Sequence, residues 1–140
     1  MKLLGFNFTK INVEKEKDSF TDLKISNSID VSSIEEVKQE ILKSKEDVLA
    51  IKFKYSVLYN PKIAKVELEG NILLSVEPSM TKEVLKKWKD KETPEEFRMP
   101  LFNIILRKAG VKALELEDGM NLPLHMQMPL LRKQENSDKK

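Results

Sequence analysis

Two neighbouring segments of alternating apolar and polar residues, joined at a proline, constrain the fold of this chain more than any other feature. In residues 49–59 every second side chain is large and apolar, and residues 64–76 show the same two-residue period except at Gly70. This is the period of a strand with one buried face. Asn60-Pro61 lies between the two segments, and proline pushes the residue before it out of the helical region. The pattern therefore predicts a long antiparallel hairpin.

Two more strands are predicted before this hairpin. Leu4, Phe6 and Phe8 alternate with polar residues, but the apolar positions then move by one residue to Ile11 and Val13. Such a shift indicates either a β-bulge or a strand that is buried on both faces. Residues 23–31 carry apolar side chains at positions 23, 25, 29 and 31, which is the period of one half-buried strand.

Helical periodicity is expected on both sides of the hairpin. Residues 32–46 are predicted to form a short connecting helix, because Ser33 could cap it and Glu36 lies three residues further on. After the hairpin, Thr81 could cap a helix with apolar residues at positions 84, 85 and 88 on one face.

A second helix is predicted to begin near Thr93-Pro94-Glu95-Glu96, which has the layout of a capping box with proline at the first helical position. Pro100 either kinks this helix or begins another one. Gly110 and Gly119 are candidates for its end.

The composition fits one soluble domain. The chain has 140 residues, of which 40% are hydrophobic and 34% are charged, and this is enough for a packed core. We expect a single domain over residues 1–131 and a disordered charged tail over residues 132–140. No cysteine is present, and no export signal or membrane-spanning stretch is recognisable, so a cytoplasmic location is expected. The 25 Lys and Arg nearly balance the 23 Asp and Glu, so no global field favours nucleic acid or an acidic membrane.

No residue pattern points to catalysis, a metal or a cofactor. His125 is the only histidine, and no nucleophile motif marks a serine as its partner, so a solvated or loosely packed side chain is expected there. The four glycines lie too far apart for a phosphate-binding loop. We therefore expect a protein that binds other molecules and is not an enzyme.

Two segments could form a binding surface. Lys82–Lys91 sets Trp88 among lysines, as an RNA- or ribosome-binding helix would, although Trp88 could equally anchor the core. Residues 122–131 are rich in leucine and methionine, and methionine adapts its shape to varied partners. The same residues could instead cap the core.

Five short motifs follow one another in a recognisable order. Thr9-Lys10-Ile11-Asn12-Val13-Glu14 ends the first strand, and the return strand of the hairpin contains Glu67-Leu68-Glu69-Gly70 and then Leu73-Leu74-Ser75-Val76. Met99-Pro100-Leu101-Phe102 and Met120-Asn121-Leu122-Pro123-Leu124-His125-Met126 come later. Taken together, over about residues 4–131, their order and spacing resemble those of the SecB chaperone family.

This resemblance implies an α+β fold, a four-stranded antiparallel sheet with helices packed on one face. It implies assembly into a dimer of dimers through first-strand edges and long helices. It also implies an ATP-independent holdase that binds unfolded or precursor polypeptides in apolar grooves during protein export. The translocase ATPase SecA, or a toxin–antitoxin pair, would be a further partner, and RNA binding through Lys82–Lys91 is the alternative.

The resemblance also supplies candidate residues. Candidates for the client groove are apolar or aromatic: Trp88, Leu122, Leu124, Met126, Met128 and Leu130. Candidates for the oligomer interface are Leu4, Phe6, Phe8, Leu101, Ile104 and Ile105. Glu14 and Glu67 match two positions of the acidic surface that docks the translocase.

Overall fold

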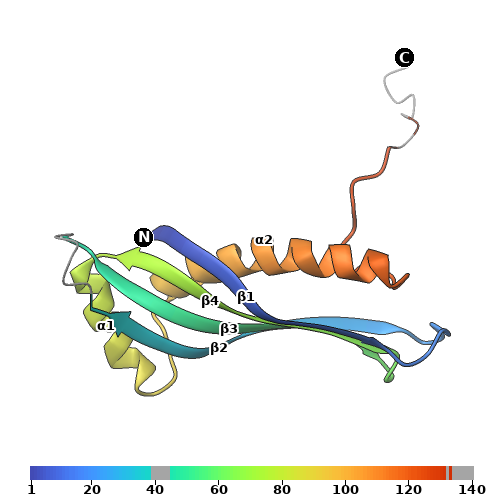
Figure 1. Ribbon diagram of the computed structural model, residues 1–140, viewed down its shortest axis with the longest axis horizontal. Helices are drawn as coiled ribbons and strands as arrows, with labels where there is room; N and C mark the ends of the chain where they lie inside the picture. Colours follow the sequence, from blue (N-terminus) through green and yellow to red (C-terminus); the bar gives the residue numbers. More distant parts are fainter. Residues whose placement is uncertain (39–44, 132, 134–140) are drawn as a thin grey trace, which may run out of the picture.

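A four-stranded antiparallel sheet is followed by two helices in the computed structural model, which describes residues 1–38, 45–131 and 133 (Figure 1). The elements are β1 (Lys2–Lys15), β2 (Lys24–Val37), β3 (Asp47–Asn60), β4 (Ala64–Val76), α1 (Pro78–Trp88) and α2 (Glu95–Gly119). The strand order is β1-β4-β3-β2, so the predicted hairpin forms the centre and the first two strands form the edges. The α+β fold with helices on one face is confirmed. No helix in the described ranges is long and apolar enough to cross a membrane.

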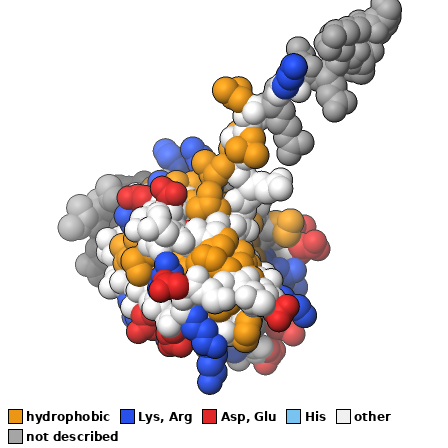
Figure 2. Space-filling model, turned by 90° about the vertical axis from the view of Figure 1, so that its right-hand side faces the viewer, with side chains coloured by type: hydrophobic (Ala, Val, Ile, Leu, Met, Phe, Trp, Pro, Cys, Tyr) orange, Lys and Arg blue, Asp and Glu red, His pale blue; other side chains and the backbone are white. Residues whose placement is uncertain are grey.

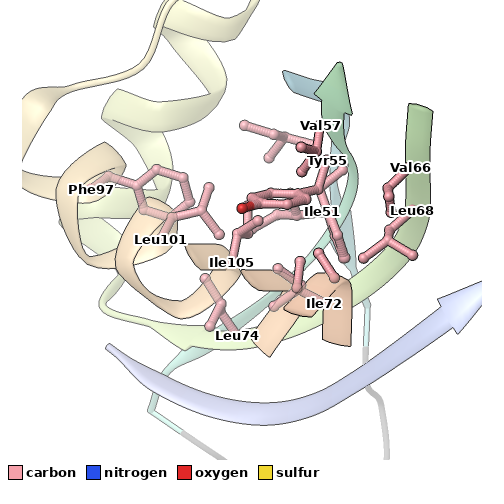
Figure 3. Packing of buried hydrophobic residues seen from close by; sticks show 14 of the residues in the cluster. Ile51, Tyr55, Val57, Val66, Leu68, Ile72, Leu74, Phe97, Leu101 and Ile105 are labelled. Atoms are coloured by element: carbon pink, nitrogen blue, oxygen red, sulfur yellow. The ribbon is translucent and has the colours of Figure 1, made fainter. Parts of the chain in front are cut away.

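The core lies between the central hairpin and α2. Alternate side chains of β3 and β4 point to the helix side of the sheet, and Tyr55 and Leu68 are among those that are 0% exposed. From α2, Phe97, Leu101 and Ile105 point back at them across the interface (Figure 3). The two-residue period of the hairpin and the helical period of α2 thus bury one common apolar layer.

The edge strand β1 contains two bulges. Its pairing with β4 shifts register between Leu3 and Gly5 and again between Phe8 and Lys10. A bulge adds one residue on one strand, so each shift returns the apolar side chains to the same face. The residues opposite the buried positions of β4 are Leu3, Phe6, Phe8, Ile11 and Val13. Of the two interpretations of the parity change, the bulge is confirmed.

The predicted connecting helix at residues 32–46 is wrong over its first part, because β2 continues as a strand to Val37. A register shift between Val31 and Ser33 marks a third bulge, and Ile34 then faces the helices beside Ile51. The bulge places apolar residues three apart in the sequence, and this spacing imitates a helix. Residues 39–44, which hold the rest of the predicted helix, lie outside the described residues.

The two helices differ from prediction at their ends. α1 begins at Pro78, and Thr81 lies inside it, where its hydroxyl donates to the carbonyl of Glu77. α2 begins after Pro94 without a side-chain cap and runs through Pro100 and Gly110 to Gly119. Gly110 therefore does not end the helix, whereas Gly119 does.

Candidate functional site

An open hollow of about 590 Å³ lies where the edge strand β2 meets both helices. We call it the edge groove. It is lined by Ile29, Asp30, Val31 and Ser32 of β2, by Trp88 at the end of α1, by Lys91, Glu92 and Thr93 between the helices, and by Arg98 and Phe102 of α2. Its apolar walls come from four side chains on three different elements, and its rim carries charges of both signs.

Trp88 is both a core residue and a groove residue. Its side chain is half-buried and packs against the core. The Nζ atom of Lys91 lies 4.7 Å from the centroid of the indole ring, within the range of a cation–π interaction. Arg98 is held nearby by a hydrogen bond from its Nη1 to the carbonyl of Thr93, at 3.1 Å. The groove wall is therefore fixed before any ligand arrives.

One side of the groove is an unpaired strand edge. In the described part of the chain, β2 pairs with β3 alone, so its other edge has no strand partner. Such an edge presents free backbone N–H and C=O groups to which an extended polypeptide can add. A hollow with apolar walls and a polar rim beside an open edge suits a peptide that offers both backbone and apolar side chains.

The chain after α2 turns back along the helix. Leu122 is 5% exposed and belongs to the core, and the carbonyl of Pro123 accepts a hydrogen bond from the Tyr59 hydroxyl. Beyond that point exposure rises steadily, from 38% at Met126 to 74% at Leu130. Of the two interpretations of this segment, core cap and exposed surface, the first holds for its beginning and the second for its end.

His125 is the centre of a buried polar network, so the expectation of a solvated or loosely packed side chain is wrong. The His125 Nδ1 atom lies 2.7 and 2.9 Å from the two carboxylate oxygens of Glu117, and both side chains are at most 1% exposed. Its Nε2 lies 2.9 Å from the Tyr55 hydroxyl, which accepts a hydrogen bond from Asn27 at 3.2 Å. The network joins β2, β3, α2 and the terminal segment.

This arrangement satisfies the hydrogen-bonding capacity of a neutral imidazole. With the proton on Nδ1, His125 donates to Glu117, and Nε2 accepts the Tyr55 O–H. The backbone N–H of His125 also donates to Glu117, at 2.9 Å. The network therefore anchors residues 122–125 to the sheet and to the end of α2.

The two tyrosines of the chain both lie in this region, and both have raised pKa values. Burial, followed by the negative charge of Glu117, raises the pKa of Tyr55 to about 12, although the hydrogen bond from Asn27 opposes the shift. Burial and then Glu117 raise the pKa of Tyr59 as well. The folded state thus favours neutral phenols.

We expect the protein to lose stability in alkaline solution as these phenols ionise. Because both pKa values are raised above that of the unfolded chain, the stabilisation is complete below about pH 10 and is lost as the pH rises through about 12. Absorbance of the ionised phenol, followed together with circular dichroism, measures this. The Tyr55→Phe/Tyr59→Phe variant is the control for lysine deprotonation and should lose less stability over the same range. Phenol ionisation near pH 10 in a folded protein would contradict the expectation.

The proposed docking carboxylates lie on the opposite face of the sheet and are paired there. Lys65 Nζ lies 3.1 Å from Glu14 and 3.4 Å from Glu67, and Lys54 approaches Glu67 at 3.6 Å. A hydrogen bond from Asn12, reinforced by Lys65, holds the pKa of Glu67 below its usual value. Glu14 and Glu67 therefore belong to a ladder of mixed charge.

The residues predicted for an oligomer interface divide into two groups. Leu101 and Ile105 lie on the side of α2 that faces the sheet. Both are 0% exposed, so neither can contact a partner. Phe6 and Phe8 are half-buried and pack edge to face, with ring centroids 5.1 Å apart. Leu4, at 49% exposure, and the half-buried Ile104 retain open surface. Assembly through β1 stays a prediction.

The basic helix α1 separates its lysines from its tryptophan. Lys82, Lys86 and Lys89 are exposed, whereas Trp88 faces the edge groove beneath Lys91. An RNA-stacking surface needs aromatic rings among the exposed cations. The geometry of α1 adds no support for RNA binding, which stays a prediction.

Local sequence patterns did not indicate the roles of several groove and network residues. The two-residue period placed Ile29 and Val31 on the buried face of a strand, but it could not show that the helices leave that face partly open. Phe102 belongs to the motif Met99-Pro100-Leu101-Phe102, but the motif did not predict a role for its side chain. The partners of His125 carry no local signal, because Tyr55 is 70 residues away in the sequence.

The strand order, the helices on one face and the groove beside an edge strand define a class, the SecB-like α+β fold. Among solved structures, the chain is similar to the Mycobacterium tuberculosis Rv1957 SecB-like chaperone in complex with a ChAD peptide from Rv1956 HigA1 antitoxin. The TM-score is 0.52, and the alignment covers 95% of this chain and 92% of that chain at 11% sequence identity. The likeness is therefore one of fold. No family model matches the sequence, and no curated protein does.

Proposed function

We propose that this protein is an ATP-independent holdase chaperone of the cytoplasm that binds unfolded or extended polypeptides in the edge groove and catalyses no reaction. The observation that carries this proposal is the hollow walled by Trp88 and Phe102, with polar and charged groups at its rim, beside the unpaired edge of β2. A holdase gains by binding a non-native chain, and the necessary surface is exposed apolar area next to free backbone groups. The SecB-like fold supports the same function, because the similar Rv1957 chain was solved with a bound peptide.

We propose that the partners are polypeptide clients. The charge pattern gives less support to a translocase partner. An acidic docking surface attracts a basic partner, but Glu14 and Glu67 are already paired with Lys65 and Lys54. Lys10, which pairs with Glu69 at 3.5 Å, adds a further cation to that face. Like charges opposed across an interface cost affinity. Delivery of precursors to SecA would thus need another surface, whereas holding an antitoxin or another unfolded client would not.

Oligomerisation fits the surface of α2. This helix carries apolar residues on its outward side as well as on its inward side, including Met99, Leu106 and Val111, which are 39% to 60% exposed. Large apolar side chains that stay exposed in this way can mark a contact surface. We propose that this outward face and the β1 edge meet other copies in a dimer of dimers, and the mass in solution tests this directly.

The chaperone proposal predicts that the protein suppresses aggregation of a denatured client at a near-stoichiometric ratio. Trp88→Ala and, independently, Phe102→Ser should weaken client binding at least about tenfold, because buried aromatic side chains dominate such interfaces. Leu58→Ser is the matched control, since Leu58 is an exposed leucine on the opposite sheet face, at 41% exposure.

Light scattering of the client and fluorescence anisotropy of a labelled client measure the two effects. Unchanged aggregation at a large molar excess of this protein would contradict the proposal. Salt-sensitive retention of RNA, abolished when Lys86, Lys87 and Lys89 become glutamine, would instead favour the RNA-binding alternative.

A further inference from the structure

The last described residues of the chain leave the body beside α2, where Met126 lies against Gly110. We call Met126–Leu131 the terminal strap. Its residues have no regular secondary structure, and Met128, Leu130 and Leu131 are 50%, 74% and 106% exposed. Figure 1 shows this segment running away from the sheet and helices, and Figure 2 shows hydrophobic side chains continuing from the body onto it. Three large apolar side chains within four residues are thus at least half exposed.

Two contacts place the start of the strap on the β2 side of α2. The Met126 side chain lies against Gly110, where an added Cβ would be 3.2 Å from the Met126 Cε and 3.7 Å from the Tyr55 hydroxyl. Asn27 of β2 bonds the same hydroxyl. On the other side of α2, Lys108 reaches the Phe6 ring of β1 instead, at 5.8 Å from its centroid. The strap therefore begins between α2 and β2, as the groove does.

The length of the strap is sufficient to reach the groove. From the end of α2, the chain has turned back by nine residues of helix, about 14 Å, when Met126 reaches Gly110. The groove residue Phe102 lies about 12 Å further along the same helix. Six extended residues span up to about 20 Å. The strap is therefore long enough to reach the groove if it folds back along α2.

The chemistry of the strap matches that of the proposed client. Met126, Met128 and Leu130 occupy alternate positions, so an extended strap would turn all three to the same side. That side can meet the apolar wall of the groove, while the strap backbone meets the open edge of β2. The strap offers the same combination of backbone and apolar groups that an unfolded client would offer.

The anchor of the strap is buried and hydrogen-bonded, whereas the strap itself is exposed. The buried pair of His125 and Glu117 fixes the residue that precedes Met126, and Tyr59 fixes Pro123 two residues earlier. A segment that is tethered within its own length of a groove has a high effective concentration there, so weak contacts suffice for closure. The gain from burying its side chains and the entropy lost on ordering them are of similar size.

We propose that the terminal strap closes over the edge groove of its own chain and competes with client polypeptides for it. This inference rests on the proposed function of the groove. The open position seen in the structure is the client-accepting state, and the closed position protects the apolar wall when no client is present. A client then binds with an affinity reduced by the fraction of closed molecules.

The absence of cysteine in the sequence allows a direct test of proximity. In the Ser32→Cys/Leu130→Cys variant, one cysteine lies in the groove and the other in the strap, and a disulfide within one chain should form under mild oxidation. In the control, Ser56→Cys/Leu130→Cys, the first cysteine lies on the opposite sheet face and should not react within the chain. Non-reducing electrophoresis separates the products. A disulfide only between chains, or equal reaction of both variants, would overturn the proposal.

A second measurement uses Trp88, which is the only tryptophan. Without client, Met128→Ser/Leu130→Ser/Leu131→Ser should make Trp88 more accessible to acrylamide, and Gln127→Ser should not. The same triple variant should bind fluorescein-labelled, reduced and alkylated α-lactalbumin about threefold more tightly than the wild type. Weaker binding would overturn the inference, because the strap would then be part of the client site.

These readouts separate the two proposals. If neither the wild type nor the triple variant binds the labelled α-lactalbumin, the chaperone proposal fails. The disulfide and the quenching of Trp88 still decide whether the strap closes. If both proteins bind it equally and quenching is unchanged, the groove is a client site without a strap.

Discussion

Glu117→Ala should destabilise the protein by about 2–6 kcal/mol, because it removes the shared acceptor of two buried hydrogen bonds. The carboxylate is 0% exposed and accepts hydrogen bonds from both the ring and the backbone N–H of His125. Alanine leaves both donors buried without an acceptor, and each such group costs about 1–3 kcal/mol. The anchor of residues 122–125 would be lost with them.

Urea unfolding of Glu117→Ala, followed by circular dichroism, measures this loss. Glu115→Ala is the matched control, because Glu115 lies on the same helix but is 70% exposed and only pairs with Lys112 at 3.6 Å. An exposed pair of this kind contributes at most about 1 kcal/mol. If the two variants lose the same stability, the buried network does not hold the terminal segment.

A double-mutant cycle sharpens this result. His125→Ala alone should also destabilise the protein, because the Tyr55 hydroxyl loses its acceptor and Glu117 loses its closest donor. Once either residue is gone, removal of the other should cost much less, since the two side chains act as one unit. Additive losses would show that they are independent.

Gly70→Ala should be the second strongly destabilising change, by about 3 kcal/mol or more. A Cβ at this position would lie 2.5 Å from the backbone oxygen of Asn7 and 2.7 Å from the Phe53 ring. The first contact is with the backbone of β1, which is held by the ladder, and the second is with a ring in the core. Neither neighbour can move away cheaply, so β1 should separate from β4 near the bulge.

The partner strand offers the control. Gly5→Ala would place its Cβ 3.8 Å from Leu73, an ordinary contact, and neither glycine has a positive φ. This change should be close to neutral, or stabilising by a few tenths of a kcal/mol through the unfolded chain. Urea midpoints compare the two variants, and hydrogen exchange of β1 amides shows whether the loss is local. Equal midpoints would contradict the steric argument.

Local periodicity predicted the central hairpin correctly, because each strand carries its own two-residue period and its own turn signal. The β1 bulge was predicted as one of two alternatives, since the parity change in the sequence cannot itself separate a bulge from burial on both faces. The end of β2 was predicted as helix, and the reason is physical. The bulge at Ser32 produces an apolar spacing of three residues, and only the pairing with β3 shows that the backbone stays extended.

The candidate site was predicted only in part. Trp88 was selected by its residue type, and the structure places it in the groove wall. Leu122 was selected in the same way, but it is buried in the core. A leucine on the surface and a leucine in the core have the same sequence signature, so burial had to be decided by what packs against it.

By itself the sequence determined the central strands, the helical second half and the absence of recognisable catalytic motifs, because these depend on neighbouring residues or on composition. Only the tertiary structure decided where β2 ends, that His125 is buried and that the edge groove is open. Each of these depends on contacts between distant residues, such as Asn27 with Tyr55 and Tyr55 with His125, which are 28 and 70 positions apart. The central hairpin of alternating residues is therefore encoded locally, whereas the groove beside it exists only once the sheet, the helices and the terminal segment have packed together.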